Sequence, residues 1–117
     1  APHANMVVVS SQLATRGSPH GADYAASKAA LSTWARSLAL AVGPEGKRVN
    51  VLAPGYVDTD ILAGDSDEKR NQRIQEVPLK RIGTGDDMAS IVSFLLSSDA
   101  AYITGSVLHA NGGLYLP

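Results

Sequence analysis

The stretch NMVVVSS, residues 5–11, decides the fold of this chain. Its apolar residues are mostly β-branched and follow one another without polar alternation, which is typical of a strand buried on both faces of a parallel sheet. Two serines follow the valines, and the carboxyl ends of strands in such sheets are where ligands bind. The stretch therefore predicts a buried strand with hydroxyl groups at a candidate binding edge.

The segments after this strand alternate between helix and strand. Residues 22–42 are rich in Ala, Leu, Ser and Lys and hold no Gly or Pro, so we predict one long helix there. We further expect a strand over 47–53, a helix over 88–98 after a capping box at 84–87, and a strand with a glycine turn over 105–113. Helical crossovers imply parallel pairing, so this order predicts a layered α/β fold.

The composition indicates an ordinary globular protein and excludes several classes of function. The chain has 117 residues, 44% of them hydrophobic, and a formal net charge of -1, which fits a single domain without a basic surface for nucleic acid. It holds no cysteine, which excludes disulfides and thiol chemistry. No apolar run is long enough to span a bilayer, so we expect no membrane partner and a cytoplasmic location. His3, His20 and His109 lie in different segments, so we expect no metal site.

Tyr24 and Lys28, in the stretch DYAASK, are spaced as a candidate acid/base pair. A helix places residues i and i+4 on one face. A phenol ordinarily ionises near pH ~10, and a nearby ammonium group stabilises the phenolate. The pair alone is weak, because many helices carry such residues on a solvated surface. Ser11 stands thirteen residues before Tyr24 at the strand end, where its hydroxyl can bond a substrate carbonyl.

Five segments together resemble the C-terminal half of the short-chain dehydrogenase/reductase family. Within that family they resemble the 3-oxoacyl-carrier-protein reductases most. They are VVVSS, YAASK, RVNVLAPGYVDTD, PLKRIGT and YITGSVLHANGG, in that order and with the expected spacing. The resemblance covers essentially all of the chain. It implies the C-terminal half of a Rossmann-like doubly wound parallel sheet, with strand-helix-strand-helix-strand order. It also implies a single partial domain over residues 1–117, with residues 58–82 as a substrate-lid insertion, and a homo-oligomer, either a dimer or a tetramer.

The same resemblance implies roles for single residues. Tyr24 would exchange a proton with the substrate oxygen, Lys28 would support Tyr24 and bond the nicotinamide ribose, and Ser11, rather than Ser10, would orient the substrate. Tyr24 and Lys28 would also contact the cofactor, NAD or NADP. Four further residues would line its nicotinamide end: Pro54, Gly55, Val57 and Thr59.

These roles imply an NAD(P)-dependent oxidoreductase that interconverts a carbonyl and a secondary alcohol. The family's glycine-rich pyrophosphate turn has no counterpart here, since GSPHGAD (17–23) carries Asp23 where a glycine is needed. An alternative is therefore a catalytically silent half-domain with an assembly or remnant role. A third hypothesis keeps the fold and changes the reaction to epimerisation or dehydration. The sequence does not distinguish NAD from NADP or name the substrate.

Two stripes on the helix at 22–42 are assigned by spacing. Trp34, Leu38 and Ala41 follow Ala30 at helical intervals, so we predict that they pack against the core. A second stripe consists of small residues and includes Ser32. Small side chains let another surface approach the helix closely, and that surface is either the sheet or a neighbouring subunit of an oligomer.

Overall fold

The computed structural model describes residues 4–117, without the side chain of Ile61, so His3 lies outside the described residues. Its strands are β1 (Asn5–Val9), β2 (Arg48–Pro54) and β3 (Val107–Ala110). Its α-helices are α1 (Leu13–Arg16), α2 (Ala22–Val42), α3 (Asp60–Ala63), α4 (Asp67–Glu76) and α5 (Gly85–Leu96). Short 3₁₀ turns lie at Gly43–Glu45 and Ser98–Ala100.

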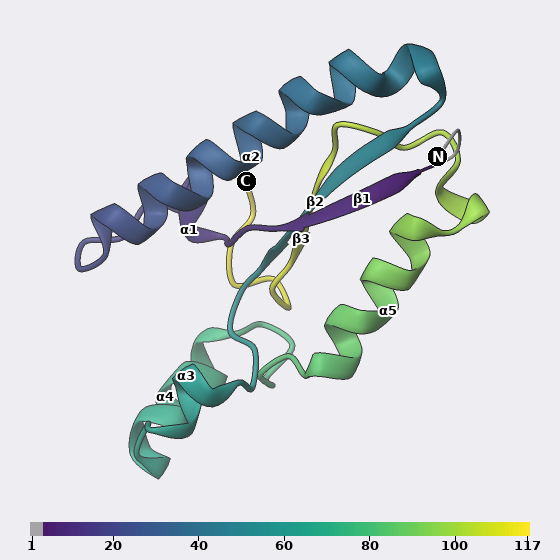
Figure 1. Cartoon of the computed structure of the whole chain (residues 1–117). Coiled ribbons are helices and arrows are strands. Elements are labelled where there is room, and N and C mark those ends of the chain that lie inside the picture. Colours follow the sequence, from purple (N-terminus) through teal and green to yellow (C-terminus); the bar gives the residue numbers. More distant parts are fainter. Residues whose placement is uncertain (1–3) are drawn as a thin grey trace.

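The three strands form a parallel sheet in the order β1-β2-β3, and helices cover it as a doubly wound sheet requires. Val51 of β2 lies opposite Val8 of β1 and Val107 of β3. Helices α2 and α5 lie on either side of the strands (Figure 1). The α/β prediction is confirmed, because each pair of parallel strands is joined through a segment that contains a helix.

Strand β2 is the centre of the core because both of its faces are covered. Val49 and Val51 are buried in one cluster with Ala35 and Ala39 of α2. Successive residues of a strand point to opposite faces, so Leu52 lies on the side away from α2 and is 1% exposed. Burial on both faces explains why this strand is nearly continuous in apolar residues.

Helix α2 has the predicted bounds, but the face that carries Trp34 does not pack against the sheet as predicted. The buried residues of this helix are small: Ala25, Ser32, Ala35 and Ala39. Trp34 is 52% exposed, so its assignment to the core was wrong, and of its stripe only Leu38 packs against the core cluster. Small side chains let α2 approach the strands closely, and a bulky indole does not fit that gap.

The other predicted elements are present with shifted ends. The capping box is confirmed: the Thr84 hydroxyl accepts a bond from the Asp87 N–H at 3.1 Å, and the Asp87 carboxylate accepts the Thr84 N–H at 2.9 Å. It starts α5 at Gly85 rather than at residue 88. The first strand ends at Val9 rather than Ser11, and the third spans four residues because a glycine turn follows it.

Helices α3 and α4 lie beyond the carboxyl end of the sheet, away from its other helices (Figure 1). The segment after α4 returns to the sheet, where the Leu79 N–H donates to the Gly112 carbonyl at 3.1 Å. Gly112 has φ +63°, and an added Cβ there would meet a Val77 methyl at 2.6 Å. No described helix is both long and apolar enough to cross a membrane.

Candidate active site

The two serines after β1 have different surroundings. Ser10 is buried, and its hydroxyl donates to the Lys28 carbonyl of α2 at 3.0 Å while lying 2.8 Å from the Ser32 hydroxyl. The Ser11 hydroxyl accepts the Leu13 N–H at 3.2 Å and lines a cleft. Adjacent residues of an extended chain point to opposite sides, which sends one serine to the helix and the other to the cleft.

Tyr24 and Lys28 lie one turn apart near the start of α2, as the spacing predicts. The Lys28 ammonium lies 5.6 Å from the centre of the Tyr24 ring and donates to the Val9 carbonyl at 3.2 Å. Tyr24 is 48% exposed and lines the same cleft as Ser11. A bond to the end of β1 therefore fixes the ammonium beside the phenol.

The cleft has a volume of about 690 Å³ and lies between the segment after β1 and the segment after β2. Five of the predicted site residues line it: Ser11, Tyr24, Gly55, Val57 and Thr59. Lys28 and Pro54 are not among its lining residues. Pro54 instead ends β2, where its carbonyl accepts the Gln12 N–H at 3.0 Å.

Gly55 brings the turn after β2 against the turn after β3. Its N–H donates to the Ala110 carbonyl at 3.0 Å. A Cβ on Gly55 would lie 2.6 Å from the Asn111 Cβ and 3.0 Å from its Cα. Only glycine fits here without movement of Asn111.

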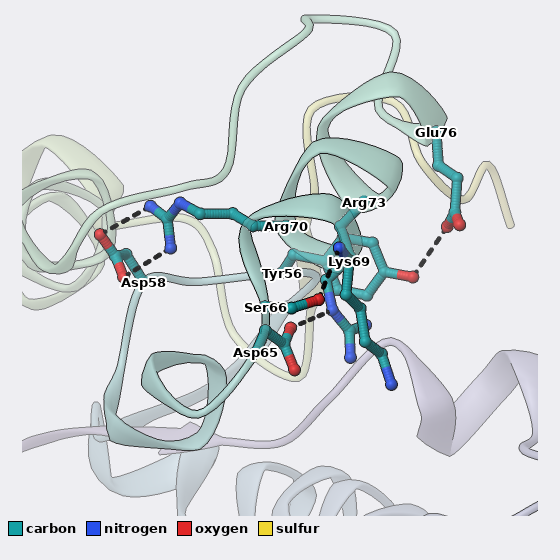
Figure 2. A network of polar contacts seen from close by, with 8 residues as sticks. All are labelled: Tyr56, Asp58, Asp65, Ser66, Lys69, Arg70, Arg73 and Glu76. Atoms are coloured by element: carbon teal, nitrogen blue, oxygen red, sulfur yellow. Dashed lines mark hydrogen bonds and ion pairs between the residues drawn. The ribbon is translucent and has the colours of Figure 1, made fainter.

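A network of polar contacts holds α4 to the segment after β2 (Figure 2). The Arg70 guanidinium donates to both carboxylate oxygens of Asp58, at 3.2 and 3.0 Å. The Tyr56 hydroxyl donates to the Glu76 carboxylate at 2.9 Å. The guanidinium carbon of Arg73 lies 4.9 Å from the centre of the Tyr56 ring. Bidentate and stacked contacts of this kind fix orientation as well as distance.

The network shifts several ionisation equilibria. The Arg70 guanidinium holds the pKa of Asp58 below its usual range. Burial raises the pKa of Tyr56, and the bonded Glu76 carboxylate raises it further. Asp65, which accepts a bond from Arg73 Nε at 2.6 Å, raises the pKa of that guanidinium. The arginines of the network therefore remain charged, and the tyrosine neutral, across the ordinary pH range.

Three other polar residues lie at or near the cleft. His20 lines the cleft and is exposed. Asp60 begins α3, and the Asp58 carboxylate pairs with Arg70 of α4. Among the residues that the structure describes, no group of three or more His, Asp or Glu side chains is placed to hold a metal ion.

Comparison with known proteins identifies the family. A family model described as "Enoyl-(Acyl carrier protein) reductase" matches residues 1–115. The chain belongs to the short-chain dehydrogenase/reductase family. The 3-oxoacyl-[acyl-carrier-protein] reductase FabG of Escherichia coli is 42% identical over 114 residues, and that of Vibrio cholerae is 41% identical over 111 residues.

Solved structures agree with this short-chain dehydrogenase/reductase assignment. A Brucella melitensis protein titled a short-chain dehydrogenase/reductase, glucose/ribitol dehydrogenase, superimposes with a TM-score of 0.91 at 32% identity. A 3-oxoacyl-[acyl-carrier protein] reductase from Brucella melitensis gives 0.90, also at 32% identity. These matches cover 97% of the present chain but 46% and 42% of those proteins. The chain likewise spans 47% of the Escherichia coli relative and 46% of the Vibrio cholerae relative.

Sequence reasoning missed four side chains of this short-chain dehydrogenase/reductase cleft: Gln12, Arg16, Tyr56 and Arg73. Gln12 and Arg16 belong to the short α1 region, whose four-residue helix is too brief for a periodic signal. Tyr56 and Arg73 meet only because α4 folds back over the turn after β2. No local pattern in the sequence encodes that contact.

Proposed function

We propose that this chain is the catalytic half of an NAD(P)-dependent oxidoreductase that interconverts a carbonyl and a secondary alcohol. The observation that supports it most is the meeting of Ser11 and Tyr24 at one cleft, with the Lys28 ammonium 5.6 Å from the tyrosine ring. The tyrosine hydroxyl supplies or removes the proton at the substrate oxygen. The serine hydroxyl orients that oxygen, and the ammonium stabilises negative charge on the phenol.

The residues after β2 fit the nicotinamide end of the cofactor. Gly55 lines the cleft at this turn, and its backbone packs against Asn111 with no side chain between them. Val57 and Thr59 line the same wall and offer backbone and hydroxyl groups. NAD or NADP would accept or donate a hydride when bound here. The chain holds no glycine-rich turn for the pyrophosphate, so its own residues hold only the nicotinamide end.

The segment 58–82 is proposed as a substrate lid within one partial Rossmann-like domain. It forms one wall of the cleft through Thr59, Leu62 and Arg73. Its base is anchored by the Val57–Gly83 bridge. A segment held at its base and carrying charged residues outward suits a cover over a small substrate.

The test is turnover and its dependence on Tyr24. The protein carrying this chain is mixed with NADH or NADPH and a panel of ketones, and nicotinamide absorbance is followed. We expect turnover that falls at least a hundredfold in Tyr24→Phe, because that variant removes only the hydroxyl group that exchanges the proton. Thr33→Val, at an exposed position of α2 outside the cleft, serves as the control and should keep its rate. Equal rates for Tyr24→Phe and the parent protein would refute the assignment.

A half-domain without turnover is the second candidate. It keeps the same fold and cleft but assigns them an assembly or remnant role in place of catalysis. The homo-oligomer, a dimer or a tetramer, is part of the proposal for the enzyme. Turnover by the protein that carries this chain, and its loss in Tyr24→Phe, separates the two candidates.

A further inference from the structure

The wall of the cleft carries a local excess of positive charge. The whole chain is nearly balanced, with 10 Lys and Arg against 11 Asp and Glu. The residues that line the cleft nevertheless include the guanidinium groups of Arg16 and Arg73 and no carboxylate. A cleft lined by charges of one sign attracts ligands of the opposite sign.

The two arginines are not equivalent. Arg73 is already bound to Asp65 at 2.6 Å and stacked on Tyr56. The guanidinium of Arg16 forms no ion pair and no side-chain hydrogen bond within residues 4–117, and it is exposed. Arg16 therefore has its donors available for a ligand in the cleft.

Gln12 gives a second and independent indication that a polar ligand binds here. It lines the same cleft, is 4% exposed, and its Oε1 is buried without a hydrogen-bond donor among the described residues. Buried polar atoms are ordinarily bonded, so this acceptor lacks a donor. The Nε2 of the same amide is not buried and forms no hydrogen bond within the described residues, so its N–H groups can donate to an anionic ligand in the cleft. Gln12 and Arg16 are four residues apart, so they lie on one side of α1.

We propose that Arg16, assisted by Gln12, selects carbonyl substrates that carry a carboxylate or phosphate group a few bonds from the carbonyl. The inference rests on the proposed function, because the carbonyl oxygen is placed at Ser11 and Tyr24. Arg16 lies five residues after Ser11, which is about 7.5 Å along a helical path at roughly 1.5 Å per residue. A planar guanidinium binds both oxygens of a carboxylate or phosphate at once.

The experiment compares charged and neutral probes that differ only in the anionic group. The carboxylate arm uses 4-oxopentanoate and its methyl ester, and the phosphate arm uses dihydroxyacetone phosphate and dihydroxyacetone. Each is measured for binding by calorimetry and for kcat/KM with the protein and its preferred nicotinamide cofactor. We expect one charged probe to be favoured roughly tenfold to a hundredfold over its neutral partner, as for a charge-assisted bond. The favoured arm identifies the anionic group.

The variants are Arg16→Gln and, as a matched control, Arg36→Gln, an exposed arginine of α2 outside the cleft. Arg16→Gln should remove the preference by raising KM for the charged probe, and Arg36→Gln should keep the preference. Turnover of neutral and charged probes with equal kcat/KM would overturn the inference and leave the proposed function standing. Anion binding that depends on Arg16 without any turnover would support an anion site at Arg16, but it would refute the proposed function and with it the selection of carbonyl substrates. Absence of anion binding would overturn the inference.

Discussion

Replacing the two serines after β1 one at a time should separate a structural hydroxyl from a functional one. Ser10 is 4% exposed and its hydroxyl joins β1 to α2 through Lys28 and Ser32. The Ser11 hydroxyl accepts a hydrogen bond only from the Leu13 N–H, and Ser11 lines the cleft. The variants Ser10→Ala and Ser11→Ala remove the same atom from neighbouring residues, so each is the other's control.

The geometry sets the size of the loss in Ser10→Ala. Its hydroxyl donates to the Lys28 carbonyl at 3.0 Å, and the Ser32 hydroxyl lies 3.0 Å from that same carbonyl. When Ser10 loses its hydroxyl, Ser32 can donate to the carbonyl instead, so one net hydrogen bond is lost. That costs about 1 kcal/mol of unfolding free energy, or roughly 4–8 °C in Tm for a domain of this size. In Ser11→Ala water in the cleft can bond the Leu13 N–H, so the expected cost is below about 0.5 kcal/mol.

The assay pairs urea unfolding, followed by far-UV circular dichroism, with steady-state carbonyl reduction. We expect Ser10→Ala to lower the unfolding midpoint and keep kcat/KM within about threefold of the parent protein. We expect Ser11→Ala to keep the midpoint and lose roughly a hundredfold in kcat/KM, as for removal of a group that positions a reacting oxygen. A larger loss of activity in Ser10→Ala than in Ser11→Ala would refute the division of roles.

Three further changes test the turn after β2, the start of α5 and the exposed face of α2. Gly55→Ala should lower the free energy of unfolding by about 1–3 kcal/mol in urea titrations, because the added Cβ would lie 2.6 Å from the Asn111 Cβ. An unchanged urea midpoint would contradict this close approach. The Arg81 guanidinium, together with the hydrogen bond from the Thr84 N–H, holds the pKa of Asp87 well below its ordinary 3.8. The ionised Asp87 therefore stabilises the folded state above about pH 3.8, and this contribution is lost as pH falls further. The urea midpoint should therefore fall more steeply below pH 4 in the parent protein than in Asp87→Asn, and parallel curves would refute this. Trp34→Ser should leave the free energy of unfolding within about 0.5 kcal/mol of the parent protein, because its indole is 52% exposed. A large loss of stability would show that the indole is buried within the monomer.

The parts of the fold that the sequence predicts well depend on local signals. Helix α2 begins and ends at the predicted residues because Gly21 and Gly43 flank a run without Gly or Pro. The capping box at Thr84 needs only residues three apart. The family resemblance located the cleft residues Ser11 and Tyr24, since both belong to contiguous motifs.

The parts that the sequence does not predict depend on contacts between distant segments. Which face of α2 meets the sheet depends on the width of the gap, so Trp34 was assigned to the wrong side. Tyr56 and Glu76 are twenty residues apart and meet only when α4 returns over the turn after β2. Arg16 lies five residues after the motif residue Ser11, but the proposed role of Arg16 depends on a cleft lined without carboxylates. The sequence does not show which residues line that cleft.

Arg73 links the proposed lid to the charge of the cleft. Its guanidinium is bound to Asp65 and lies over Tyr56, so its charge is largely balanced. A rotation of the Arg73 side chain that breaks the bond to Asp65 would leave a second guanidinium facing the same cleft as Arg16. An anionic substrate would then gain attraction from both arginines, and by linkage it would favour the rotamer in which Arg73 is released. The ion pair between Arg73 and Asp65 therefore limits how strongly this wall attracts an anion.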